Sequence, residues 1–225
     1  MGLKESGLRG SLRNVSVGID AIPDNDIYLQ DDWGDNKLQD RDGSGTTTYN
    51  GVEGVYRPDW NVPRSSVVAE NENLVMNQGV AYTDINLNLD ETVTWRYDNI
   101  EYDETSSDTD SQFSIALWSE STNFDRRFME SSYTLFFEPS NDEVRLIYVD
   151  SDINFDELIA PVSIPASPIS SIEVERSDGG EFSLAIEGTE KGSATDDSLE
   201  SPEYTAFVSR DDGDYEQSID EIKVS

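Results

Sequence analysis

The side chains best equipped for chemistry in this chain are carboxylates, because Asp and Glu supply 48 of its 225 residues. Two carboxylates about 5 Å apart, one with a raised pKa, can hydrolyse glycosidic bonds. The chain has no His and no Cys. It therefore excludes disulfides, thiol catalysis, His-based acid–base chemistry and Ser-His-Asp triads. It also has no glycine-rich loop of the kind that cradles phosphates.

Calcium is the ion that suits such a sequence, since Ca²⁺ takes six to eight oxygens from carboxylates and carbonyls. Asp211, Asp212 and Asp214 form the candidate site, and Asp150 with Asp152 makes a second acidic turn. Because acids are so abundant, a solvated acidic turn is the alternative that we favour. We predict no cofactor, with Ca²⁺ at Asp211, Asp212 and Asp214 as the candidate exception.

Aromatic side chains can bind sugars by stacking. The four tryptophans are Trp33, Trp60, Trp95 and Trp118. Trp95 shares the apolar parity of its strand, which predicts a core position. Trp118 has the opposite parity from Phe113 and Ile115, which predicts an outer face or a strand end. Trp60 lies in an irregular segment, where burial as a loop plug is the alternative. We predict that any ligand site uses Trp118 and Trp60.

The net charge of -33 is spread over the chain and has three interpretations. Disorder is disfavoured by the 10 Tyr, 8 Phe and 4 Trp, which fall in patterned segments. A basic partner would require an acidic block rather than a uniform coat. The third interpretation is adaptation to concentrated salt, because a Debye length of about 3 Å at 1 M screens self-repulsion. We predict a halophilic protein that does not bind nucleic acid, whose phosphates it would repel.

Residues 1–26 differ from the rest of the chain in charge. Lys4, Arg9 and Arg13 stand against one acid, Glu5, within residues 1–19. The remainder carries a formal charge of about -35. A docking arm for assembly through Lys4, Arg9 and Arg13 is one interpretation, and a frayed terminus is the other. The segment has no apolar core of a signal peptide, and no 18-residue apolar run is present to insert into a membrane.

From residue 27 onward the pattern is typical of strands. Apolar residues alternate with polar ones over 92–97, 112–117, 133–137, 144–149, 172–176, 182–186 and 204–208. Turn signals separate these segments at 139–142, 178–180 and 211–214. Two long acidic loops, 102–111 and 191–202, are also expected. The sequence thus predicts an all-β antiparallel sandwich over 27–225, preceded by an extended arm over 1–26.

A resemblance to a known superfamily rests on five segments in order. They are DDWGDNKL (31–38), RPDW (57–60), SVVAENENLVM (66–76), a strand-Arg-x-Asp-Gly-strand hairpin (172–188) and a last strand (218–224). This order resembles the concanavalin A-like lectin/glucanase superfamily, in particular its laminin-G-like branch. The resemblance implies a jelly roll of two antiparallel sheets whose last strand pairs near the first. It also implies glycan or protein binding, glycan hydrolysis or a structural role, and often one Ca²⁺.

The catalytic pattern of the glucanase branch is incomplete here. Glu101-Tyr102-Asp103-Glu104 is the nearest match to its Glu-x-Asp-x-(x)-Glu strand, and the final Glu is missing. We therefore expect no enzyme activity and no catalytic residue.

The expected function is that of a non-catalytic, homo-oligomeric recognition protein on the surface of a haloarchaeal virus. It would be a spike, turret or tail-fibre head that meets other virion proteins through its arm and presents loops to host surface glycans. The predicted location is the virion surface or another extracellular site. A glycan-hydrolysing enzyme or its carbohydrate-binding module is the first alternative. A ligand-free cytosolic structural protein of a halophile is the second.

Overall fold

The computed structural model describes residues 28–40, 46–49, 52–56, 58–63, 66–102, 112–125, 128–201, 203–209 and 216–225. The predicted arm, with Lys4, Arg9 and Arg13, lies outside these residues. Within them, no helix is long and apolar enough to cross a membrane.

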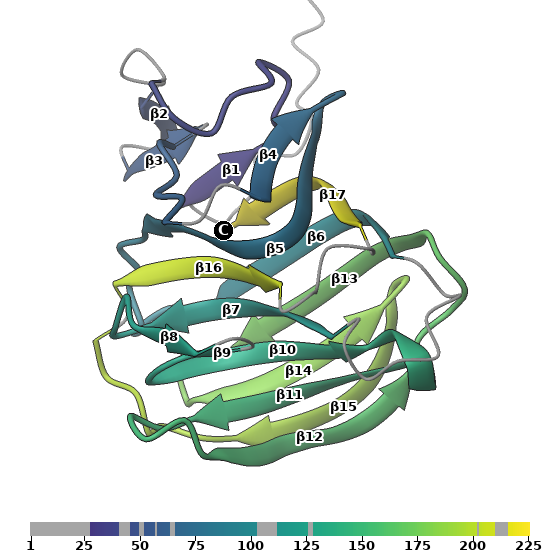
Figure 1. Cartoon of the computed structure of the whole chain (residues 1–225). Coiled ribbons are helices and arrows are strands. Elements are labelled where there is room, and N and C mark those ends of the chain that lie inside the picture. Colours follow the sequence, from purple (N-terminus) through teal and green to yellow (C-terminus); the bar gives the residue numbers. More distant parts are fainter. Residues whose placement is uncertain are drawn as a thin grey trace, which may run out of the picture.

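Two antiparallel sheets pack face to face as a β-sandwich, which confirms the predicted all-β fold (Figure 1). Sheet A contains, besides the first half of β5 (Asn73–Asp84), β4 (Ser66–Glu70), β17 (Gln217–Val224), β6 (Val93–Glu101), β13 (Ile169–Arg176), β14 (Glu181–Ile186) and β15 (Thr189–Thr195). Sheet B contains the second half of β5, β16 (Tyr204–Ser209), β7 (Phe113–Ser119), β10 (Ser132–Glu138), β11 (Glu143–Val149) and β12 (Phe155–Ser163).

Smaller elements complete the sandwich. β1 (Leu29–Asp31) pairs antiparallel with the end of β17 and parallel with β3 (Val52–Tyr56), which pairs with β2 (Thr46–Tyr49). β8 (Phe124–Asp125) and β9 (Phe128–Met129) form a separate two-stranded piece, and η2 (Pro139–Asn141) is a single 3-10 turn. Because β17 pairs with β1 and β5, the expectation that the last strand lies beside the first is confirmed.

The strand β5 belongs to both sheets. Its residues Leu74 to Met76 pair with β17 in sheet A, and Val80 to Asp84 pair with β16 in sheet B. The second half begins at Gly79, which pairs with Ser209 and has a φ of 149°, a conformation that side chains disfavour. A strand that bends in this way is a common means of joining two packed sheets.

Alternation of apolar residues explains most of the strands. In β14, Phe182, Leu184 and Ile186 enter the core while the residues between them face outward. The hairpin predicted at 178–180 joins β13 to β14, with Gly180 at φ 75° and its N–H donating to Ser177 O at 3.0 Å.

The prediction that Trp118 faces a ligand is wrong. Its side chain is 0% exposed and packs against Trp95 and Tyr133, with ring centroids 5.5 and 4.9 Å away. The cause is a β-bulge in β7, which places the extra residue Leu117 between two paired positions on both neighbouring strands. Since one extra residue reverses the parity of the strand beyond it, Trp118 turns into the core.

The prediction that Trp60 faces a ligand is wrong as well. Trp60 is 1% exposed, and its Nε1–H donates to Oδ2 of the fully buried Asp31 at 2.7 Å. Its ring lies 5.3 Å from that of Phe207. The alternative of a loop residue that plugs the core therefore holds, because a buried carboxylate supplies the hydrogen bond that the indole requires.

Candidate functional site

Three adjacent strands of sheet A share a break in their alternation. Tyr97 and Ile100 in β6 are core residues three positions apart, as are Ile219 and Ile222 in β17, and Ile169 and Ile172 in β13. The strands pair so that these residues lie at two common levels: Ile100 opposite Ile219 and Ile169, and Tyr97 opposite Ile222 and Ile172. Each strand therefore carries two successive polar residues between the levels.

We call these polar residues the crease. It consists of Asp98–Asn99 in β6, Asp220–Glu221 in β17 and Ser170–Ser171 in β13. In β6 the second polar residue, Asn99, has a left-handed backbone with a φ of 50°. Asn tolerates this conformation better than most residues. The crease thus keeps six polar side chains out of the core in the middle of a sheet.

The β6 and β17 part of the crease opens onto a hollow of roughly 750 Å³. The hollow is lined by Asp32, Gly34, Asn71, Glu72, Asn73, Arg96, Asp98, Asn99, Asp220 and Glu221. All ten residues are polar or glycine. The hollow is therefore equipped for hydrogen bonding and offers no ring face for stacking.

The β4–β5 hairpin supplies one wall of the hollow. Asn71 and Glu72 both have positive φ, 53° and 65°, as a two-residue turn of type I′ requires. The N–H of Glu72 donates to Asn36 Oδ1 at 2.9 Å, which ties the hairpin to the segment after β1. This hydrogen bond, from a backbone N–H to a side-chain amide, holds the wall against the segment after β1.

The hollow is strongly acidic, with one guanidinium among five carboxylates. Arg96 donates through Nε to both oxygens of Asp98 at 3.0 Å, and its NH1 lies 3.7 Å from Glu173. The hydrogen bond to Asp98 raises the pKa of Arg96 above its usual value. Gln30 donates to Glu221 Oε1 at 2.6 Å. The remaining carboxylate oxygens give the hollow many acceptors for an incoming ligand.

Asp220 is a partly buried carboxyl in the hollow. Burial raises the pKa of its carboxyl, a hydrogen bond from Asn99 lowers it, and the nearby Glu101 and Asp98 raise it further. The amide of Asn73 also faces Asp220 and donates to it in the orientation that satisfies both groups. Asp220 is therefore held in place by two amides.

The predicted metal residues are not brought into this site. Asp211, Asp212 and Asp214 lie outside the described residues, as does Asp103. Among the residues that the structure describes, no three His, Cys, Asp or Glu side chains are grouped so as to hold a metal ion. In the second acidic turn, Asp150 Oδ1 accepts the N–H groups of Asp152 and Asn154, each at 2.8 Å.

Sequence reasoning missed the hollow, although a signal for it was present. Tyr-Asp-Asn-Ile at 97–100, Ile-Ser-Ser-Ile at 169–172 and Ile-Asp-Glu-Ile at 219–222 are three copies of one pattern, apolar-polar-polar-apolar. A prediction based on strict alternation of apolar and polar residues would end a strand where two polar residues follow each other. Reading three similar interruptions as one feature requires the pairing of the strands, which the sequence does not state.

No protein-family model matches the sequence, and no curated protein is similar to it. Solved structures do match. The carbohydrate recognition domain of Emp46p, in a potassium-bound form, superposes with a TM-score of 0.57 at 10% identity over 73% of this chain and 87% of that one. This chain has a lectin-like β-sandwich fold.

Two further structures share the fold. The carbohydrate-binding module CBM66 from Bacillus subtilis matches with a TM-score of 0.50 at 10% identity, over 72% of this chain and 94% of that one. The binding domain of botulinum neurotoxin serotype D matches with a TM-score of 0.50 at 13% identity, over 84% of this chain and 47% of that one. At these identities the likeness concerns the fold alone.

Proposed function

We propose that this chain is a non-catalytic recognition module that binds glycans at the hollow of sheet A. The observation that carries the proposal is the hollow itself, a polar recess built on paired strands of a lectin-like sandwich. The names of the matching structures support a carbohydrate as the ligand class. A fold alone does not select a function, so the chemistry of the hollow supplies the argument.

The hollow suits a ligand with many hydroxyl groups. Its carboxylates accept hydrogen bonds from hydroxyls, and Asn71, Asn73 and Asn99 can both donate and accept. With one guanidinium against five carboxylates, the hollow repels anionic groups. We therefore expect neutral sugars or amino sugars to bind better than uronic acids or sulfated sugars.

One observation favours glycan hydrolysis as a second candidate. Asp220 has a raised pKa and lies near Glu101 and Asp98, the arrangement that an acid and a base would need. Against it, Glu101 is exposed, while two amides hold Asp220. Turnover of a polysaccharide that disappears in both Glu101→Gln and Asp220→Asn would replace recognition with catalysis.

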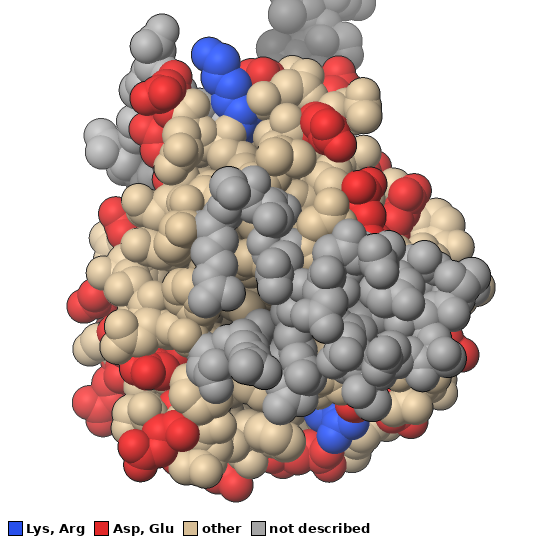
Figure 2. Space-filling model, in the orientation of Figure 1, with Lys and Arg blue, Asp and Glu red and all other residues tan. Residues whose placement is uncertain are grey.

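The biological setting that we propose is the surface of a virus of a halophilic archaeon, in a homo-oligomer anchored by residues 1–26. The charge of -33 supports a salt-rich setting. Figure 2 shows Asp and Glu side chains scattered around one face rather than gathered in a block, with few Lys or Arg. A coat of this kind suits solvation in brine better than attraction of one basic partner.

The test is a glycan-array measurement on the full chain in molar NaCl. Wild type should bind neutral or amino-sugar glycans, and Asp98→Asn with Asn99→Ala should abolish that binding. The matched control is Glu190→Gln with Lys191→Ala, at exposed positions of β15. Equal binding by the crease variant and wild type would refute the hollow as the site.

A further inference from the structure

We infer that the outer face of sheet B carries a second sugar subsite, in which one ring of the Tyr82–Tyr204 pair stacks against the apolar face of a neutral pyranose and the other ring borders the sugar. The inference rests on the proposed glycan recognition for its ligand class and concerns a different surface. It would make one chain bivalent, with a hydrogen-bonding subsite on sheet A and a stacking subsite on sheet B.

The two tyrosines are placed side by side by the pairing of β5 with β16. Tyr204 lies opposite Asp84, and Ala206 lies opposite Tyr82, so the two rings are diagonal neighbours on one face. Their centroids are 5.9 Å apart and their planes meet at 87°. Two ring planes at a right angle form the walls of a corner, where the start of β16 pairs with the end of β5.

The exposure of these rings sets them apart from the buried aromatics of the core. Every described Trp is at most 1% exposed, whereas Tyr82 and Tyr204 are both partly exposed. Tyr82 packs against a small apolar cluster made of Val80, Ala116, Met129, Ala206 and Val208. The cluster supports the corner from below, and part of each ring remains open to solvent.

Carboxylates stand beside the corner. Asp84 and Glu203 are both exposed. Burial raises the pKa of Tyr204, and the charges of Glu203 and Asp84 raise it further. A pyranose has an apolar face of C–H groups and a polar edge of hydroxyls. One ring face matches the C–H face of the sugar, the perpendicular ring borders its edge, and the two carboxylates match its hydroxyls. Small ligands require this combination of aromatic surface and a few placed polar groups.

The experiment is isothermal titration of the full chain in molar NaCl with maltohexaose, mannohexaose and galactohexaose. At least one should bind wild type with two sites per chain. Tyr82→Ala and Tyr204→Ala should each weaken one site by roughly 3- to 10-fold, while Tyr204→Phe, which keeps the ring, should retain it. Phe155→Ala is the matched control, since Phe155 is an exposed aromatic on β12, 47% exposed.

The two subsites fail in different ways. If the hollow is wrong and the corner is right, wild type binds at a single tyrosine-dependent site, and Asp98→Asn leaves that site unchanged. If the corner is wrong and the hollow is right, a single site remains that Tyr82→Ala and Tyr204→Ala do not change. That second result, an equal loss in Phe155→Ala, or no binding of any of the three oligosaccharides would overturn the inference.

Discussion

The outer faces of the two sheets differ in the residues that they present to solvent. On sheet A, the crease brings successive polar residues to the surface, and the hollow above it is lined by carboxylates and amides. On the outer face of sheet B, Val80, Ala116, Ala206 and Val208 are buried in a cluster with Met129, which belongs to the separate strand β9. On sheet A, the interrupted alternation of the strands places polar residues at the surface. On sheet B, apolar residues of the outer face are covered by a further segment of the chain.

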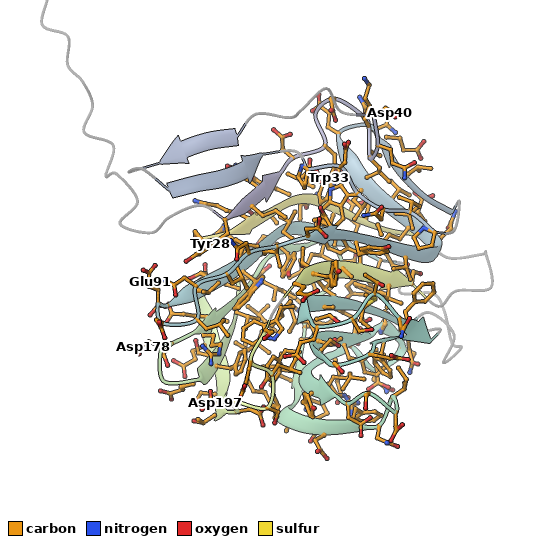
Figure 3. The ribbon with its side chains drawn as sticks, turned by 90° about the vertical axis from the view of Figure 1, so that its left-hand side faces the viewer. Tyr28, Trp33, Asp40, Glu91, Asp178 and Asp197 are labelled. Carbon is orange, nitrogen blue, oxygen red and sulfur yellow. The ribbon has the colours of Figure 1, made fainter. Side chains whose placement is uncertain are left out.

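The outer face of sheet A meets solvent through charged and amide side chains, whereas the apolar residues on the outer face of sheet B are protected from solvent by packing. Figure 3 shows where charged and apolar side chains lie: Trp33 lies inside, while Glu91 and Asp178 point outward at the rim. Salt should therefore act mainly on the acidic surface, and removal of apolar atoms mainly on the interior and on sheet B. We expect salt concentration to have the largest effect on stability and pH the smallest.

Low salt should unfold the chain entirely. As NaCl falls well below molar concentrations, repulsion within a net charge of -33 is no longer screened. Circular dichroism during a salt titration measures the transition. Asp98→Asn with Glu221→Gln should lower the NaCl needed for half-folding more than Asp152→Asn with Asp156→Asn, which are exposed near β12. A fully folded chain in dilute buffer would contradict the halophilic interpretation.

Loss of a core indole should be the most damaging single substitution. Trp118→Ala removes contacts with Trp95, Tyr133 and Phe182 and the ring beneath Arg176, whose guanidinium lies 5.2 Å from the Trp118 ring. We expect a loss of about 3–5 kcal/mol in the free energy of unfolding, measured by denaturant titration in molar salt. Trp118→Phe should lose clearly less. A near-neutral Trp118→Ala would mean that the indole is not buried.

The outer faces should respond unequally to truncation. Met129→Ala, in the strand β9 that packs on the outer face of sheet B, removes a side chain that is 0% exposed, and it should cost about 2–3 kcal/mol. Arg96→Ala on sheet A breaks ion pairs of a side chain that is 47% exposed, and it should cost less than about 1 kcal/mol. The same denaturant titration compares them. Equal costs would remove the distinction between the faces.

The smallest effect concerns Asp220 and depends on pH. Because burial raises the pKa of Asp220, the folded chain holds this proton more tightly than the unfolded chain. The ionised carboxyl therefore lowers stability above its folded pKa, and the penalty disappears as pH falls through that pKa. Asp220→Asn should raise the free energy of unfolding at neutral pH by at most about 0.5 kcal/mol. At acidic pH, where Asp220 is already protonated, the substitution should not raise it. Asp178→Asn, at an exposed turn, is the control.

The sequence was sufficient for the sandwich but not for the surfaces. Alternation identifies the strands, as at Phe182, Leu184 and Ile186, and Gly180 marks a hairpin. A single bulge at Leu117 reverses the orientation of Trp118, and nothing local announces it. Trp60 required a buried partner, Asp31, which is 29 positions away. Alternation in the sequence predicts which face of a sheet a side chain occupies only where the strand contains no bulge.

The central claim is that the hollow of sheet A contacts the sugar. A crystal structure of the full chain, grown in molar salt with an oligosaccharide that the glycan array identifies, tests it most directly. We expect sugar hydroxyls within hydrogen-bonding distance of Asp98, Asn99 and Asp220. A sugar bound elsewhere, with these three side chains free of ligand, would show that the hollow is not the binding site.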